Sequence, residues 1–177
     1  YRSIRDIARL PDPPARLSAL ILSHFPALRL AIGQSADGSW NGRMLAVPGR
    51  GDDPFLTVGA IPAVHRLLEF GFAPDFPPFA AVRRLLFRLL AEDTDPAYLF
   101  EFASEASSAE RRRRARLILR ESAAAVLAHL GYENDPRLRG CANRMLQRVG
   151  EFLDSPLAAD PWIEVGGKRA LSPDVSP

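Results

Sequence analysis

The chain has 177 residues, of which 47% are hydrophobic, and it balances 23 Lys and Arg against 21 Asp and Glu. This is typical of one globular domain that buries about two thirds of its unfolded surface, and the near balance of charge predicts no nucleic-acid partner. A single cysteine, Cys141, excludes an intrachain disulfide and a zinc site of several cysteines, and no apolar run reaches the roughly 18–20 residues of a membrane span, so we expect a cytoplasmic protein.

The first part of the chain is predicted to form a helix followed by a long loop. Asp12 and the two prolines after it signal a helix start, because Asp caps free backbone N–H groups and Pro is tolerated in the first turn. The apolar residues that follow at helical spacing are Leu17, Leu20, Ile21 and Phe25. Residues 34–55 are rich in Gly, Asp and Pro, which predicts a loop of a length that is often functional.

Two more helices are predicted in the middle of the chain. The first ends at Gly71, which can adopt the left-handed conformation of a helix C-terminus, and its apolar positions are Ala60, Val64, Leu67 and Leu68. The apolar positions of the second are Phe79, Val82, Leu85, Leu86, Leu89 and Leu90. The polar residues 92–96 separate it from the aromatic run 98–102, which we interpret as helix or extended connector because no second convincing strand is present.

The C-terminal part predicts two further helices and a tail. Ser107 and Glu110 have the spacing of a capping box, and the helix that they open runs to about Leu130. Asp135 and Pro136 then repeat the pattern of a cap followed by proline. The face expected to be buried in the first helix comprises Ile118, Ser122, Ala125, Val126 and Leu130, and in the second Leu138, Cys141, Ala142, Met145, Leu146, Val149 and Phe152. Residues 156–177 are predicted to be a loop-rich tail.

An internal repeat relates two of these helix junctions. Residues 63–75 align without gaps onto residues 123–135. In both copies a helix is followed by Gly, an aromatic residue and, three residues later, Asp, after which a start containing proline opens the next helix. Each unit is therefore a helix pair, and such pairs bury their apolar faces by stacking on their neighbours.

The loop at residues 34–40 contains Gln34, Gly38 and Trp40 in the order Q-x3-G-x-W. A tryptophan in such a polar loop is expected to bury its ring and to need a partner for its indole N–H, and the glutamine is expected to bind backbone groups at a helix end. This spacing resembles the QW motif of squalene-hopene cyclase, oxidosqualene cyclase and related terpene cyclases. The junctions at 70–72 and 130–138 resemble those of prenyltransferase and squalene-oxidase repeats, and the resemblance covers most of residues 14–155.

The resemblance implies an all-α fold, part of an α/α toroid in which antiparallel helix pairs form a curved array. A full toroid needs more helix pairs than this chain supplies, so residues 1–177 are expected to be one domain that is an arc or reduced form, with its repeat core at 14–155, and a segment of a longer protein. The residues that the resemblance assigns to structural motifs are Gln34, Asp37, Gly38, Trp40, Gly71, Gly131, Tyr132 and Asp135.

The acidic residues Asp93 and Asp95 are the candidates for catalysis. Terpene cyclases that protonate their substrate use a D-x-D-D acid, whose carboxyl must stay protonated, but here the last acidic position is Pro96. We therefore expect a solvated loop in which Asp95 caps the next helix, with a cyclase acid as the alternative.

No metal or cofactor is expected. Cys141 lacks the aspartate of the D-x-C zinc pair of prenyltransferases, and it is interpreted as a small core residue. The sequence predicts no metal-binding helix face at His24, His65 or His129. His65 and His129 occupy nearby places in the repeat, which indicates packing or helix-end roles.

Two surface or cavity hypotheses remain open. The arginines at 111–114, with Arg116 and Arg120, are interpreted as a solvated helix start, with an anionic partner as the alternative because positive charge there opposes the helix dipole. The aromatic residues between 70 and 102 are interpreted as core. The alternative is a lining for an apolar ligand, with Tyr98, Phe100 and Phe102 as the candidates.

Two functions follow as hypotheses. The first is a non-catalytic module, a scaffold or a binder of an apolar isoprenoid-like ligand or of neighbouring repeats. The alternative is a terpene-cyclase-like or prenyl-handling enzyme, an isomerase or transferase acting on isoprenoids, with catalytic elements outside this segment. A fold of this kind hosts both kinds of function.

Overall fold

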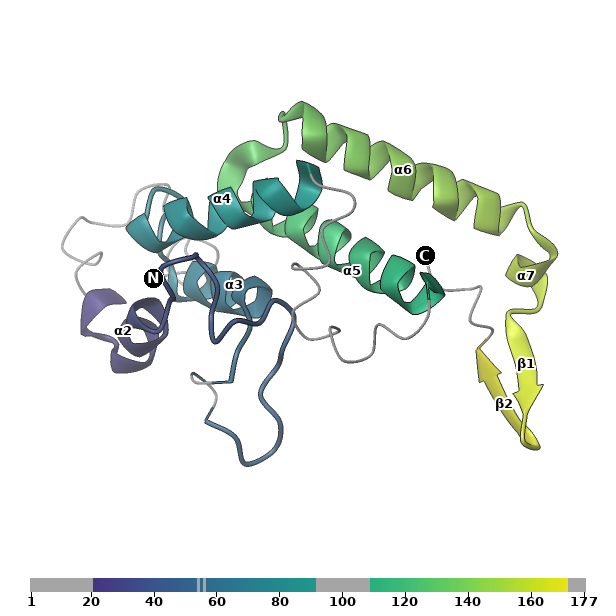
Figure 1. Cartoon of the computed structure of the whole chain (residues 1–177), viewed down its shortest axis with the longest axis horizontal. Coiled ribbons are helices and arrows are strands. Elements are labelled where there is room, and N and C mark those ends of the chain that lie inside the picture. Colours follow the sequence, from purple (N-terminus) through teal and green to yellow (C-terminus); the bar gives the residue numbers. More distant parts are fainter. Residues whose placement is uncertain (1–20, 54, 56, 92–108, 172–177) are drawn as a thin grey trace, which may run out of the picture.

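The computed structural model describes residues 21–53, 55, 57–91 and 109–171, and this part is mostly helical (Figure 1). The helices are α2 (Phe25–Ile32), α3 (Ala60–Phe70), α4 (Pro77–Ala91), α5 (Ala109–Leu127), the π-helical turn η4 (Ala128–Tyr132), α6 (Pro136–Leu153) and α7 (Pro156–Ala159). The strands β1 (Trp162–Val165) and β2 (Lys168–Leu171) form one antiparallel hairpin. The prediction of an all-α fold is confirmed.

The long helices α3 to α6 pack against one another. α5 contacts both α4 and α6, and these two neighbours run antiparallel to it (Figure 1). α3 contacts α5, and α4 contacts α6, so the corresponding helices of the two pairs also pack together. This is the nearest-neighbour packing by which repeated helix pairs bury their apolar faces.

The two repeated junctions have the same backbone geometry. Gly71 and Gly131 both adopt the left-handed conformation, with φ of 99° and 89°. After α3, the backbone N–H of Phe72 donates to the carbonyl of Leu67 over 3.1 Å, which closes the helix end. The predicted helix end at Gly71 is confirmed, and at Gly131 the same left-handed turn breaks the helical run immediately after Leu130.

The start of α6 also follows the sequence pattern. Asp135 has an extended backbone, and its side chain accepts a hydrogen bond from the backbone N–H of Arg137. Pro136 occupies the first helical position, where its missing N–H costs no intrahelical bond. The predicted cap followed by proline is confirmed here.

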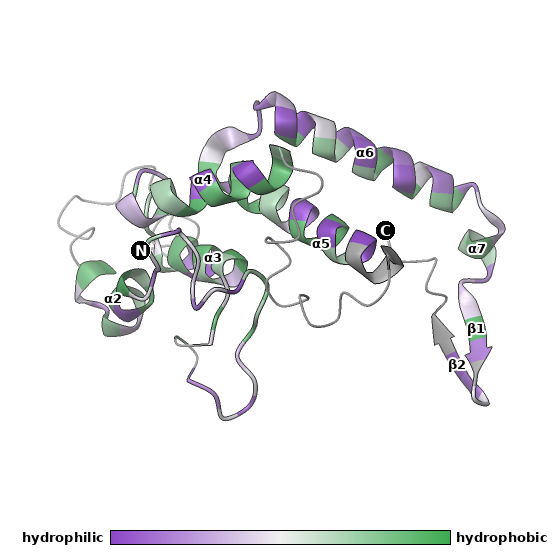
Figure 2. Ribbon diagram, in the orientation of Figure 1, coloured by the Kyte–Doolittle hydropathy of each residue, from purple (hydrophilic) through white to green (hydrophobic). Residues whose placement is uncertain are grey.

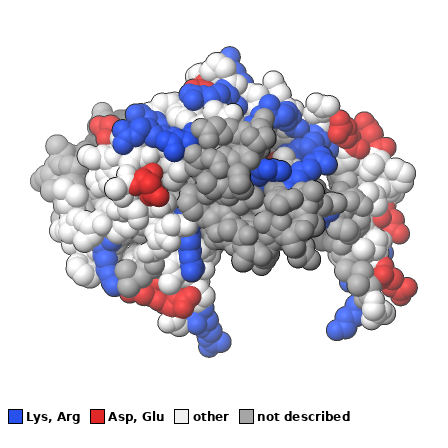
Figure 3. Space-filling model, in the orientation of Figure 1, with Lys and Arg blue, Asp and Glu red and all other residues white. Residues whose placement is uncertain are grey.

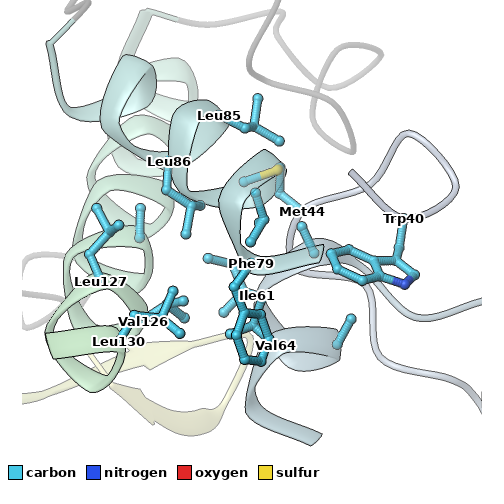
Figure 4. Packing of buried hydrophobic residues seen from close by; sticks show 14 of the residues in the cluster. Trp40, Met44, Ile61, Val64, Phe79, Leu85, Leu86, Val126, Leu127 and Leu130 are labelled. Atoms are coloured by element: carbon cyan, nitrogen blue, oxygen red, sulfur yellow. The ribbon is translucent and has the colours of Figure 1, made fainter. Parts of the chain in front are cut away.

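One continuous apolar core joins α2, the loop after it and the helices from α3 to α6 (Figure 4). The largest fully buried side chains include Trp40, Phe79, Leu30, Met44, Leu67, Leu86, Leu119 and Leu127. Burial of each such side chain stabilises the fold by about 1.5–3 kcal/mol. The core prediction for the aromatic residues is confirmed at Phe72 and Phe79, both of which are buried.

The first predicted helix is wrong as a single element. Residues 21–23 are helical, but His24 is extended and α2 begins at Phe25. The cause is Pro26, which has no N–H and whose ring clashes with the carbonyl four residues earlier in a continuous helix. Phe25 was expected to lie on the same buried helix face as Ile21, but it is 70% exposed.

The buried faces of α5 and α6 differ from the prediction. In α5, Ile118 and Ala125 are exposed. The side chains that α5 and η4 bury are Ala115, Leu119, Ala123, Val126, Leu127 and Leu130. α6 has the alternating stripes of an amphipathic helix (Figure 2), but only Leu138 and Cys141 in its first half are buried, because no described helix covers the apolar side chains of the second half.

The tail is more ordered than predicted, because residues 156–171 form α7 and the β1–β2 hairpin. The hairpin turns at Gly166 and Gly167, with φ of 58° and 73°, as a two-residue turn with positive φ at both positions requires. Two short runs separated by Gly-Gly are a local hairpin signal, so the prediction of a loop is wrong at this point. The predictions for residues 12–20, for 92–108 and for 172–177 lie outside the described residues.

Candidate functional site

The loop that follows α2 folds on itself at residues 34–40. The backbone N–H of Ser35 donates to the carbonyl of Ser39 over 2.8 Å, and the N–H of Gly38 donates to the carbonyl of Ser35 over 2.9 Å. Asp37 then fixes Ser39, because its Oδ1 accepts from the backbone N–H and from the hydroxyl at 2.8 and 2.7 Å. The loop is thus held by its own polar groups before it contacts any helix.

Trp40 joins this loop to the end of α2. Its side chain is completely buried, and its indole Nε1 donates to the carbonyl oxygen of Leu30 over 2.7 Å. Leu30 lies in the last turn of α2, where carbonyls have no partner inside the helix. The expectations that the ring is buried and that the indole N–H has a partner are both confirmed.

Gln34 joins the same loop to the beginning of α4. Its Nε2 donates to the carbonyl of Gly38 over 3.1 Å and to the carbonyl of Pro78 over 2.9 Å. Pro78 is in the first turn of α4, so the expected bond between the glutamine and backbone at a helix end is present.

Gly38 brings the loop against α4. Its φ is +92°, and a Cβ at this position would lie 2.7 Å from the backbone carbonyl of Ala81. Only glycine fits such a contact without a shift of the loop or of the helix. Residues 34–40 therefore form a structural connection between α2 and α4, made by the side chains of Gln34 and Trp40.

Tyr132 in the second junction also has a structural role, because it contacts two side chains of α4. Its hydroxyl accepts a hydrogen bond from Arg83 of α4, and its ring meets the ring of Phe87 edge-on at a centroid distance of 5.5 Å. The guanidinium of Arg137 lies over Phe87 at 3.9 Å. These contacts tie α4 to the connection between α5 and α6.

A pocket with a volume of about 240 Å³ lies between α5 and α6. The described residues that line it are Leu117, Arg120 and Glu121 from α5 and Cys141, Arg144, Gln147, Arg148 and Glu151 from α6. Basic side chains gather over this part of the molecule (Figure 3). Among the described residues, this pocket combines concavity with several ionisable groups, which makes it the candidate binding site.

Only some of the charged groups in this pocket have a partner of opposite charge or a hydrogen bond among the described residues. Arg148 forms an ion pair with Glu121 across the two helices, but its Nη1 is buried and has no hydrogen-bond partner in the described part of the chain. The Nη2 of Arg120 donates to the carbonyl of Leu90 in α4 over 2.9 Å. Burial and, secondarily, the nearby charge of Arg144 lower the pKa of Arg120.

Two residues of this pocket, Cys141 and Arg120, stand out in the sequence, but the pocket itself does not. Cys141 is buried, as predicted for a small core residue, and its Sγ lies 4.0 Å from the carbonyl of Arg120. Within the arginine run, Arg113 is exposed, in agreement with a solvated helix start. Arg144 and Arg148 were missed, although their spacing of four residues places both on one face of a helix.

His65 and His129 form a pair that the sequence did not predict. Their rings meet edge-on at a centroid distance of 5.3 Å, because α3 packs beside the end of α5. Burial and the nearby His129 lower the pKa of His65, whereas Glu69, one turn further along α3, raises it. In the described residues no three His, Cys, Asp or Glu side chains are arranged to hold a metal ion.

The remaining candidates lie outside the described residues. They are the acidic residues Asp93 and Asp95 and the aromatic residues Tyr98, Phe100 and Phe102. Their predicted roles therefore stay predictions.

Comparison with known proteins adds no assignment. No family model, no curated protein and no solved structure matches this chain. Among the described helices, none is long and apolar enough to cross a membrane.

Proposed function

We propose that this chain is a non-catalytic helical-repeat module, an arc of an α/α toroid that serves as a scaffold or binds an apolar ligand. The observation that carries the proposal is the repeated junction, in which Gly71 and Gly131 adopt the same left-handed turn before a second helix. The two resulting helix pairs stack through corresponding helices. The loop at 34–40, tied to α2 by Trp40 and to α4 by Gln34, supports the same proposal.

The ionisable groups of the described residues also favour a structural module. Asp135 pairs with Arg137 at 2.9 Å, and this hydrogen bond lowers its pKa to about 2. Arg29 pairs with Asp53 at 2.8 Å, which links α2 to the long loop. A general acid needs a carboxyl whose pKa is raised, whereas the pKa of Asp135 is lowered.

The partner of this module is a further helix pair of the same kind. The second half of α6 exposes Leu146, Val149 and Leu153, which follow each other at the i, i+3 and i+7 positions of one helical face. In a stack of helix pairs, such a face is buried by the next pair. A neighbouring pair seated there would extend the array beyond α6.

The test is native mass spectrometry of the protein from its own host, combined with an assay for turnover of squalene-like and prenyl-diphosphate substrates. We expect no turnover, and either a retained isoprenoid-like ligand or an assembly that the double variant Leu146→Ser, Leu153→Ser dissociates. The variant Asn143→Ser, at an exposed polar position of α6, is the matched control. Turnover that is lost in Asp93→Asn or Asp95→Asn would overturn the proposal in favour of a terpene-cyclase-like enzyme.

A further inference from the structure

The pocket between α5 and α6 brings three guanidinium groups together from two helices. Arg120 comes from α5, and Arg144 and Arg148 come from successive turns of α6. The acidic residues in the lining are Glu121 and Glu151. The described lining therefore has three positive charges against two negative ones.

Neither glutamate neutralises the whole cluster. Glu121 is engaged by Arg148, and the Oε1 of Glu151 accepts a hydrogen bond from the amide of Gln147 over 2.8 Å. Burial and, secondarily, the nearby charge of Arg144 disfavour the charged form of Arg120 and lower its pKa. A negative group inside the pocket would relieve this repulsion.

Arg148 has an unused donor. Its Nη1 is buried, with no hydrogen-bond partner among the described residues, although Arg148 pairs with Glu121. Buried N–H groups are nearly always paired in native proteins, so an unpaired one in a charged pocket points to a partner outside the described residues, such as a bound ligand.

We propose that this pocket binds a small oxyanion, a phosphate or carboxylate group, through Arg144 and Arg148. The planar fork of a guanidinium matches the oxygens of these groups, and hydrogen bonds between charged partners are the strong ones. Leu117 and Cys141 add an apolar wall to the 240 Å³ volume, which leaves space for a short carbon chain next to the anion. The phosphate or carboxylate group belongs either to a free anion or to the head of an amphiphile.

The primary test measures binding of inorganic phosphate by isothermal titration calorimetry at constant ionic strength with chloride as the background anion. Arg144→Gln is expected to weaken phosphate binding about tenfold, the value of one charge-assisted hydrogen bond. Arg84→Gln, which changes an exposed arginine of α4 outside this pocket, is the matched control and should leave the affinity unchanged. Absence of phosphate binding at millimolar concentration, or equal weakening in both variants, would overturn the proposal.

A second variant is expected to strengthen phosphate binding. Glu121→Gln removes the carboxylate that competes for Arg148, so phosphate binding should become several-fold tighter. If Arg148 and Glu121 form only a structural ion pair, this variant lowers the free energy of unfolding and does not improve phosphate binding, which would contradict the site. The helical circular dichroism of each variant is recorded first, to show that the protein is folded.

Butyl phosphate distinguishes the two sources. If it binds more tightly than inorganic phosphate, the apolar wall is used and the natural ligand is an amphiphile. If butyl phosphate and inorganic phosphate bind with equal affinity, the natural ligand is a free anion. Either result supports the oxyanion site. If butyl phosphate binds but its affinity is unchanged in Arg144→Gln, the interaction is apolar and the proposal fails.

Discussion

The two tryptophans of the chain lie in opposite surroundings. Trp40 is completely buried between α2 and the core, and its indole N–H is bonded to the end of α2. Trp162 begins the β1–β2 hairpin, is 43% exposed, and lies beside the guanidinium of Arg169. The region around Trp40 is held by packing from several elements, whereas the region after Cys141 contains no buried side chain among its described residues. The comparison shows that an apolar residue stabilises the fold only where several elements cover it.

The largest effect is expected from replacing the buried tryptophan. Trp40→Ala should lower the free energy of unfolding by about 3–5 kcal/mol, because it removes the largest core side chain and the bond to Leu30. Urea unfolding followed by circular dichroism measures this change. Trp162→Ala is the matched control, with an expected loss of less than about 1 kcal/mol. Equal losses in the two variants would show that the exposed hairpin carries as much stability as the core.

The next largest effect is expected from Gln34, whose amide bonds to backbone of another element, in comparison with Gln147, whose amide bonds within α6 itself. Gln34→Ala should cost about 1–3 kcal/mol, because the carbonyls of Gly38 and Pro78 lose their donor in a partly buried position. Gln147→Ala, in the exposed region of α6, should change stability by less than about 0.5 kcal/mol. Chemical denaturation of both variants checks the difference, and a neutral Gln34→Ala would remove the connecting role of the loop.

The cap of α6 should be visible in the pH dependence of stability. The hydrogen bond from Arg137 lowers the folded pKa of Asp135 to about 2, below the unfolded value of about 3.9. The stability that it contributes is present above the unfolded pKa and is lost as the pH falls toward 2. Asp135→Asn should therefore be less stable than the parent chain at pH 6, and the difference should narrow on acidification.

Asp75→Asn is the control for this prediction, because Asp75 occupies the matching place in the first junction. Thermal unfolding of the parent chain and both variants between pH 6 and 2 provides the measurement. A difference between the parent chain and Asp135→Asn that stays constant over this range would contradict a role for the ionised cap.

The smallest effect concerns the contact between α3 and α5. Burial and His129 hold the pKa of His65 below its ordinary value of about 6.5. The unfolded chain therefore binds this proton more readily, so stability is lower at acidic pH and rises as the pH increases through the unfolded pKa. His129→Gln should flatten this rise in melting temperature between pH 5 and 7.5. His24→Gln serves as the control, since His24 packs against Phe70 and away from this pair.

The local geometry of the fold could be predicted from the sequence. Gly71 and Gly131 end helical runs because only glycine adopts the left-handed turn without a steric cost, and Asp135 before Pro136 starts a helix because both residues act on the backbone next to them. The burial of Trp40 was predictable from its size and its single donor. The Gly-Gly turn of the hairpin could also have been predicted, since its signal lies within two residues.

The candidate site could not be predicted, because it depends on which helices pack together. Pro78 accepts from Gln34 over a separation of 44 residues, and His65 meets His129 only because α3 packs against α5. Arg120 and Arg148 share a pocket because α5 and α6 are neighbours. Periodicity also places Leu146 on an apolar face, but Leu146 is 69% exposed because no described helix covers it. Sequence alone determined the helix ends at Gly71 and Gly131 and the helix start at Pro136, since those signals act over a few residues. Tertiary packing decided which faces are buried and which charges meet.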